Sequence, residues 1–137
     1  MTGRLRDLIV TSWYWPIVRD FDTEPAELLG VILTTLWGLW LLLPMQTFHS
    51  SVAYNALAVV PEWLLGSVLL VIGMHAGAAL RDGRVSRRRE AALSMFGGWF
   101  AIAAAFAWGD ITNTGVVVYG VVAVAAGWVY LRLGILA

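Results

Sequence analysis

The chain has 137 residues, of which 60 % are hydrophobic and 13 % are charged, and its formal net charge is zero. A soluble domain is nearer to about 45–50 % apolar and about 25 % charged. This composition therefore excludes an ordinary soluble domain and indicates an integral membrane protein. Zero net charge gives no reason to expect a nucleic acid partner, and the absence of cysteine excludes disulfides and thiolate metal sites.

The first segment, residues 1–22, combines arginines with a helical stripe of apolar residues. The stripe contains Leu5, Leu8, Ile9, Trp13 and Ile17. Such a pattern predicts an amphipathic helix that lies in the membrane interface and positions the chain. A segment that actively disturbs or senses the membrane is the alternative interpretation. The rest of the chain, residues 23–137, is expected to form the transmembrane domain.

Four apolar runs follow, and each approaches the roughly 20 residues that a membrane-spanning helix needs. They cover residues 26–45, 61–80, 91–108 and 116–135. The pattern predicts an all-α integral membrane four-helix bundle, in which the third helix is the shortest. Thr23 is expected to cap the first helix, and Asn113 or Thr114 the fourth.

Arginine placement predicts the orientation of the bundle. The linker 81–90 holds five arginines, whereas the linkers 46–60 and 109–115 hold none. These five are Arg81, Arg84, Arg87, Arg88 and Arg89. In a four-span arrangement all nine arginines of the chain fall on one side, which the positive-inside rule makes cytoplasmic, with both termini inside. This topological role explains the cluster, and binding of anionic headgroups or nucleic acid is the alternative.

His75 is the strongly titratable residue well inside a predicted span. Ionisable groups within a membrane suggest proton relay or gating. The simpler interpretation, which we favour, is a neutral histidine bonded to a neighbouring helix.

Small residues recur at four-residue spacing in three of the spans. Gly73 and Gly77 form one pair, Ala123 and Gly127 form another, and the third predicted span holds Ser94/Gly98 and Ala101/Ala105. This spacing lets helices approach closely. It predicts tight packing either within the chain or between copies.

Other polar and aromatic residues carry no recognisable chemistry. Glu62, Asp110 and His49 are expected near the outer face, but their spacing matches no metal motif. No catalytic arrangement, phosphate loop or cofactor motif is visible, so we expect a protein that is not an enzyme and binds no cofactor or metal.

Three tryptophans fit an aromatic belt near the outer interface: Trp40, Trp63 and Trp108.

One stretch resembles small multi-spanning membrane proteins of tailed bacteriophages, in which a Thr-Phe…Tyr loop leads to a Pro-Glu-x-x-x-Gly helix start. The matching positions are Thr47, Phe48, Tyr54, Pro61, Glu62 and Gly66. Such proteins are regarded as holin-like or as membrane proteins of uncharacterised role. The resemblance implies a phage protein that acts in the inner membrane of a bacterial host.

Three functions remain open from the sequence. The first is a holin-like protein that associates with copies of itself and permeabilises the host inner membrane. The second is an accessory or superinfection-exclusion protein that binds another membrane protein. The third is a small transporter, which lacks support because the run 28–44 contains no carboxylate. In each case the lipid bilayer is the surrounding partner.

Overall fold

A computed structural model describes residues 22–44, 48, 54 and 57–136 of the chain. Its described part contains four α-helices, which are α3 (Glu24–Leu41), α4 (Glu62–Asp82), α5 (Val85–Gly109) and α6 (Thr114–Leu136). This confirms the expected all-α, four-helix fold. The predicted amphipathic segment 1–22 lies outside the described residues, apart from Asp22.

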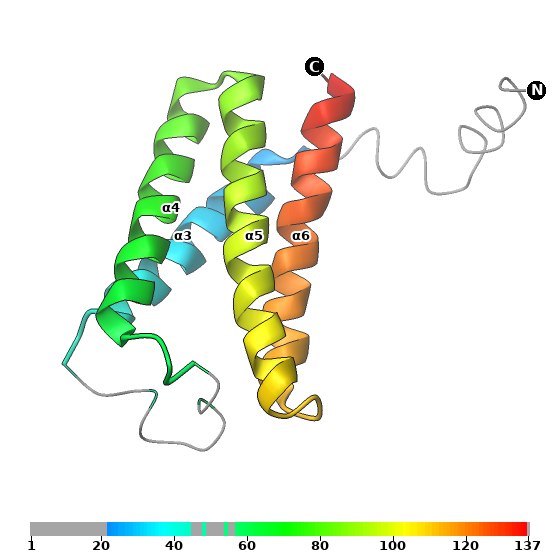
Figure 1. Ribbon diagram of the computed structural model, residues 1–137. Coiled ribbons are helices and arrows are strands. Elements are labelled where there is room, and N and C mark those ends of the chain that lie inside the picture. Colours follow the sequence, from blue (N-terminus) through cyan, green and yellow to red (C-terminus); the bar gives the residue numbers. More distant parts are fainter. Residues whose placement is uncertain (1–21, 45–47, 49–53, 55–56, 137) are drawn as a thin grey trace, which may run out of the picture.

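The helices form a ring in which chain neighbours pack against each other. α3 packs extensively on α4 and α5 on α6, while α4 and α5 share a smaller interface. α3 and α6 approach each other at only a few positions, and the backbones of α3 and α5 also come close at only a few positions. Side chains nevertheless join α3 to α5. In Figure 1, α4, α5 and α6 run side by side, whereas α3 crosses behind α4 and α5 at an angle.

Three of the described helices, α4, α5 and α6, are long and apolar enough to cross a membrane. α3 does not reach that standard, because Glu24 and Glu27 in its first turn lower the mean hydropathy of its 18 residues. The third helix was expected to be the shortest, and this was wrong. α5 has 25 residues, because it begins at Val85 and takes in residues that we had assigned to the linker.

The connection between α4 and α5 is much shorter than the predicted linker 81–90. Gly83 ends α4 in the left-handed region with φ 72°, and its N–H donates to the carbonyl of Ala79. Glycine adopts this conformation without steric cost. The chain then enters α5 directly after Arg84, so three of the five arginines lie in α5 and Arg81 lies in the last turn of α4.

Glycines bring α3 and α4 into backbone contact. A Cβ added at Gly38 would lie 2.7 Å from the backbone nitrogen of Leu70 and 2.9 Å from the carbonyl oxygen of Gly66. Gly73 lies similarly close to Thr35. A side chain at these positions would separate the helices, so the absence of a Cβ determines how closely α3 packs.

The exterior of the bundle is apolar along most of its length. Large hydrophobic side chains are exposed on every helix, for example Leu29, Val71, Phe100 and Val124. Water would penalise such a surface, whereas lipid would not. The charged residues instead gather near the helix ends.

Candidate functional site

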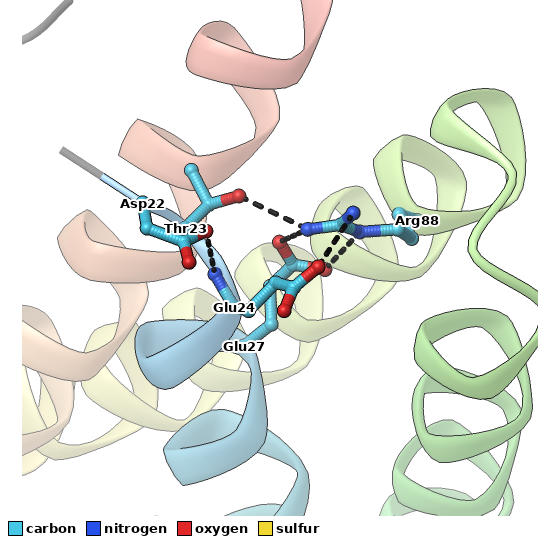
Figure 2. Close-up of polar contacts among 5 residues, drawn as sticks. All are labelled: Asp22, Thr23, Glu24, Glu27 and Arg88. Carbon is cyan, nitrogen blue, oxygen red and sulfur yellow. Dashed lines mark hydrogen bonds and ion pairs between the residues drawn. The ribbon is translucent and has the colours of Figure 1, made fainter. Parts of the chain in front are cut away.

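Five residues form a polar cluster where α3 and α5 begin, and Figure 2 shows how they face one another. Arg88 donates from Nε to Glu27 Oε2 at 2.9 Å and from Nη2 to Glu27 Oε1 at 2.7 Å. The same Nη2 donates to Thr23 Oγ1 at 3.2 Å, and Nη1 lies 3.6 Å from Glu24 Oε1. Asp22 joins the cluster by accepting a hydrogen bond from the Glu24 backbone N–H.

The Arg88–Glu27 pair is shielded from solvent. The Glu27 side chain is 4 % exposed and that of Arg88 is 11 % exposed, whereas Glu24 is 62 % exposed at the rim. The two parallel N–H···O bonds give the planar fork geometry in which arginine binds carboxylate most strongly. The pair therefore leaves neither charge uncompensated inside the bundle.

Thr23 has a role other than the one predicted. It occupies the N-cap position of α3, but its side chain makes no cap hydrogen bond. Its hydroxyl instead accepts from Arg88 on a different helix. The predicted N-cap of the fourth helix, α6, is confirmed, because Asn113 Oδ1 accepts a hydrogen bond from the backbone N–H of Gly115 at 2.8 Å.

This cluster was not predicted from the sequence. Glu27 was not singled out, and Arg88 was predicted only as one of five topological arginines. The two residues are 61 positions apart in the chain, and no local pattern pairs them. The available signal was an acidic residue at the edge of an apolar run, which needs a partner when that run is buried in a bilayer.

A lateral cleft opens where α3 and α6 fail to close the ring. Beside Glu27, a cavity of about 180 Å³ is bounded by α3, α5 and α6, and its polar lining is small. A second cavity, of about 380 Å³, continues along α3 to Trp40. The cavities share Leu33, Trp99 and Val122 in their walls. We call the two together the α3–α6 cleft.

Aromatic side chains form the floor of the α3–α6 cleft. Trp99 of α5 is buried and donates from Nε1 to Thr34 Oγ1 at 2.9 Å. The rings of Trp99 and Tyr119 stack with centroids 5.6 Å apart, and Trp37 packs on Tyr119 at 5.5 Å. Within the described residues the Trp37 Nε1 atom is buried without a hydrogen-bond partner. The floor is therefore formed by packed rings and is almost entirely apolar.

The structure places His75 away from the polar cluster around Arg88 and away from the α3–α6 cleft. It is exposed on the outer face of α4, and among the described residues no hydrogen bond to it is formed. The expected bond to a neighbouring helix is therefore not made within the described residues, because the side of α4 that packs inward carries Gly73 and Ala76 instead.

The predicted packing residues all lie at contacts within the chain. Gly73 lies against Thr35, and Gly77 has the Val31 side chain 3.4 Å from where its Cβ would be. Ala123 is buried in the core, and a Cβ at Gly127 would lie 3.2 Å from the Phe96 ring. These small residues therefore serve the fold of one chain.

The five arginines of the predicted linker divide into four environments. Arg84 and Arg87 lie near Asp82, at 3.6 and 3.3 Å from its Oδ2. Arg81 is exposed at the end of α4, and Arg88 is held by Glu27. Arg89 lies over the ring of Tyr130, with Cζ 4.6 Å from the ring centroid.

The opposite end of the bundle shows no catalytic or metal-binding arrangement among the described residues. Glu62 accepts from the backbone N–H of Phe48, and Asp110 accepts from Thr112. His49 lies outside the described residues. Among the residues searched, no three histidine, cysteine or acidic side chains are placed to hold a metal ion. Trp40, Trp63 and Trp108 are exposed, as an interfacial belt requires.

The chain matches no protein-family model, no curated protein and no solved structure. Conclusions about function therefore depend on the buried ion pair and the α3–α6 cleft.

Proposed function

We propose that this chain is a non-enzymatic integral membrane protein of a bacterial inner membrane that associates with other copies of itself. In this proposal it crosses the bilayer four times, with both termini and the arginine-rich α4–α5 turn in the cytoplasm. Three apolar helices of spanning length support the membrane location. The described arginines all lie at one end of the bundle, which supports the orientation.

α3 serves as the fourth crossing in this proposal. The glutamates in its first turn make α3 less able to cross the bilayer without a partner helix, because a carboxylate is costly in hydrocarbon. The pairing of Glu27 with Arg88 removes that cost by giving the carboxylate a partner on α5. Beyond Leu41 the apolar sequence continues through Leu42 and Leu43, which lengthens the segment.

The observation that carries self-association is the α3–α6 cleft. The pairs α3–α4 and α5–α6 pack closely, but α3 and α6 leave a cleft lined by large apolar and aromatic side chains. In lipid, helices associate through van der Waals packing rather than through burial from water. Tryptophan and tyrosine are enriched where protein surfaces bind tightly. The α3 helix of a second copy, related to the first by a twofold axis, would fill the cleft and complete the packing around Trp37 and Trp99.

The absence of cysteine from the chain makes disulfide crosslinking in membranes a direct test. Leu36 lines the cleft and is 59 % exposed, while Val71 is 66 % exposed on α4, away from the cleft. We expect Leu36→Cys to give a covalent dimer on mild oxidation and Val71→Cys to give none. Equal yields from both, or no dimer from correctly inserted Leu36→Cys, would refute association through the cleft.

Holin-like permeabilisation is the further step of this proposal, and it needs polar groups that line a lesion. Thr34 bonds Trp99, and the hydroxyls of Ser67 and Ser94 donate to carbonyls of their own helices. His75 is exposed on α4 and makes no hydrogen bond within the described residues, so it is the candidate that we name for this role. Membrane depolarisation on induced expression, abolished by His75→Leu, would support a lesion. An unchanged potential would leave an accessory or superinfection-exclusion role.

A further inference from the structure

Arg89 is held differently from the other arginines of its cluster. Among the described residues no carboxylate pairs with it, and its hydrogen-bond partner is the hydroxyl of Tyr130, 3.3 Å from Nη2. Its Nε is buried without a partner in that part of the chain. A guanidinium group offers five N–H donors. Arg89 is therefore a fixed cation with most of its donors unused.

Two neighbours hold the Arg89 guanidinium in place. The ring of Tyr130 lies beneath it in a cation–π contact, with Cζ 4.6 Å from the centroid. On the other side, a Cβ added at Gly134 would lie 3.0 Å from Cζ. The glycine thus leaves room for the side chain between α5 and the last turns of α6. Such a preorganised cation loses little conformational freedom when it binds an anion.

An apolar groove runs along the bundle surface from this arginine towards the membrane interior. It has a volume of about 440 Å³, lies between α5 and α6, and has almost no polar lining. Its walls are formed by Leu93, Phe96, Val124, Gly127, Trp128, Tyr130 and Leu131. Leu93 and Phe96 follow Arg89 at positions i+4 and i+7, so they lie on the same face of α5. Tyr130 belongs both to the groove and to the arginine contact.

We propose that Arg89 and the α5–α6 groove bind one anionic phospholipid. The phosphate would accept hydrogen bonds from Arg89, whose planar fork matches phosphate geometry. An acyl chain would lie along the groove beside Phe96 and Trp128. A phosphatidylcholine headgroup carries its own ammonium group, which offsets the attraction of its phosphate to Arg89. The groove lies on the opposite side of α6 from the α3–α6 cleft, so the lipid site is separate from the proposed self-association surface.

Native mass spectrometry of the full chain in detergent tests this site. The probes are dioleoyl phosphatidylglycerol, dioleoyl phosphatidylcholine and glycerol 3-phosphate, which carries the anionic group without the tails. We expect phosphatidylglycerol to bind about tenfold more tightly than phosphatidylcholine, and glycerol 3-phosphate to compete poorly. Equal binding of the two lipids, or full competition by glycerol 3-phosphate, would overturn the proposal.

Matched variants locate the site. Arg89→Gln removes the charge at the groove, and Arg87→Gln removes one charge from the same helix, where Arg87 pairs with Asp82. We expect about a tenfold loss of phosphatidylglycerol affinity from the first and little change from the second. Equal losses from both would indicate diffuse electrostatic attraction and refute the site.

A second pair of variants tests the groove without touching the arginine. Val124→Trp fills the groove from its exposed wall, while Val117→Trp places the same side chain on an exposed position nearer the start of α6. Lipid binding should fall only in Val124→Trp. Unchanged binding in that variant would contradict the acyl-chain assignment.

The lipid site depends on the proposed membrane insertion, which alkaline carbonate extraction checks separately. A chain released from membranes by carbonate would refute the proposed function itself. A chain that resists extraction but binds both lipids equally would refute only the lipid site.

Discussion

The two sides of α3 are packed in opposite ways. Towards α4, Gly38, Gly66 and Gly73 remove side chains from the interface, and the helix backbones come into contact. Towards α6, Leu33 and Trp37 present large side chains, and a cleft remains. Both sides are apolar, so hydrophobicity does not distinguish them. In lipid, the shape of the side chains decides which helices pack closely.

The largest effect should come from breaking the ion pair that holds α3 against α5. Arg88→Leu leaves the buried Glu27 without its partner, and breaking a buried pair in this way costs about 3–5 kcal/mol. Thermal unfolding in detergent, followed by near-ultraviolet circular dichroism of the tryptophans, measures the loss.

Two controls define the cause of that loss. Arg87→Leu, at an arginine that is 57 % exposed, should change stability little. The double variant Glu27→Leu/Arg88→Leu should recover most of the loss, because no unpaired charge remains. A double variant as unstable as Arg88→Leu would show that the packing of Arg88, rather than its charge, stabilises α3.

The side of α3 that packs against α4 should tolerate no added methyl group. Gly38→Ala places a Cβ 2.7 Å from the backbone of Leu70, and overpacking of this kind costs about 1–3 kcal/mol. Gly97→Ala is the matched control, because no atom lies within 4 Å of the Cβ position there. The same unfolding assay should show Gly97→Ala unchanged or more stable, since alanine is the better helix former. Equal behaviour of the two variants would contradict the close approach of α3 and α4.

The floor of the cleft should depend on one buried hydrogen bond. Thr34→Val removes the acceptor of the Trp99 indole N–H while nearly keeping the volume, and an unsatisfied buried donor costs roughly 1–3 kcal/mol. A double-mutant cycle with Trp99→Phe isolates the bond in the same assay. Additive losses in the cycle would show that the hydrogen bond contributes nothing.

The smallest effect should come from the α5–α6 turn, far from α3. The hydroxyl and backbone N–H of Thr112 donate to Asp110 and lower the pKa of this exposed carboxyl. Because the folded-state pKa is depressed, the stabilisation is present above the unfolded pKa and is lost as pH falls through the folded value. Unfolding of the native chain and of Asp110→Ala should therefore converge as pH falls from about 6 to about 3. A gap independent of pH would contradict the role of the charge.

Local features of the fold could be predicted because they depend on neighbouring residues. Apolar runs and Pro61 indicated the helices, and Asn113 capped α6 as expected. The start of α5 was misplaced because a run of arginines was taken for a loop, although arginine is a good helix former. Gly83 supplied the actual break between α4 and α5.

The candidate sites could not be predicted in this way. Pairing of Glu27 with Arg88, and of Arg89 with Tyr130, joins residues far apart in the chain. Each pair depends on how the helices are rotated and how far they slide past one another. A one-residue shift along α5 turns a side chain by about 100°, since the helix has 3.6 residues per turn. Periodicity alone does not determine these quantities.

The sequence by itself indicated a multi-span membrane protein, the approximate positions of the helices and the gathering of the described arginines at one end of the bundle. Each of these follows from the hydropathy and charge of short segments. Only the tertiary structure decided which arginine meets Glu27, which glycines lie between helices, and where a cleft and a groove remain. The physical reason is that these features arise from the fit between side chains on different helices.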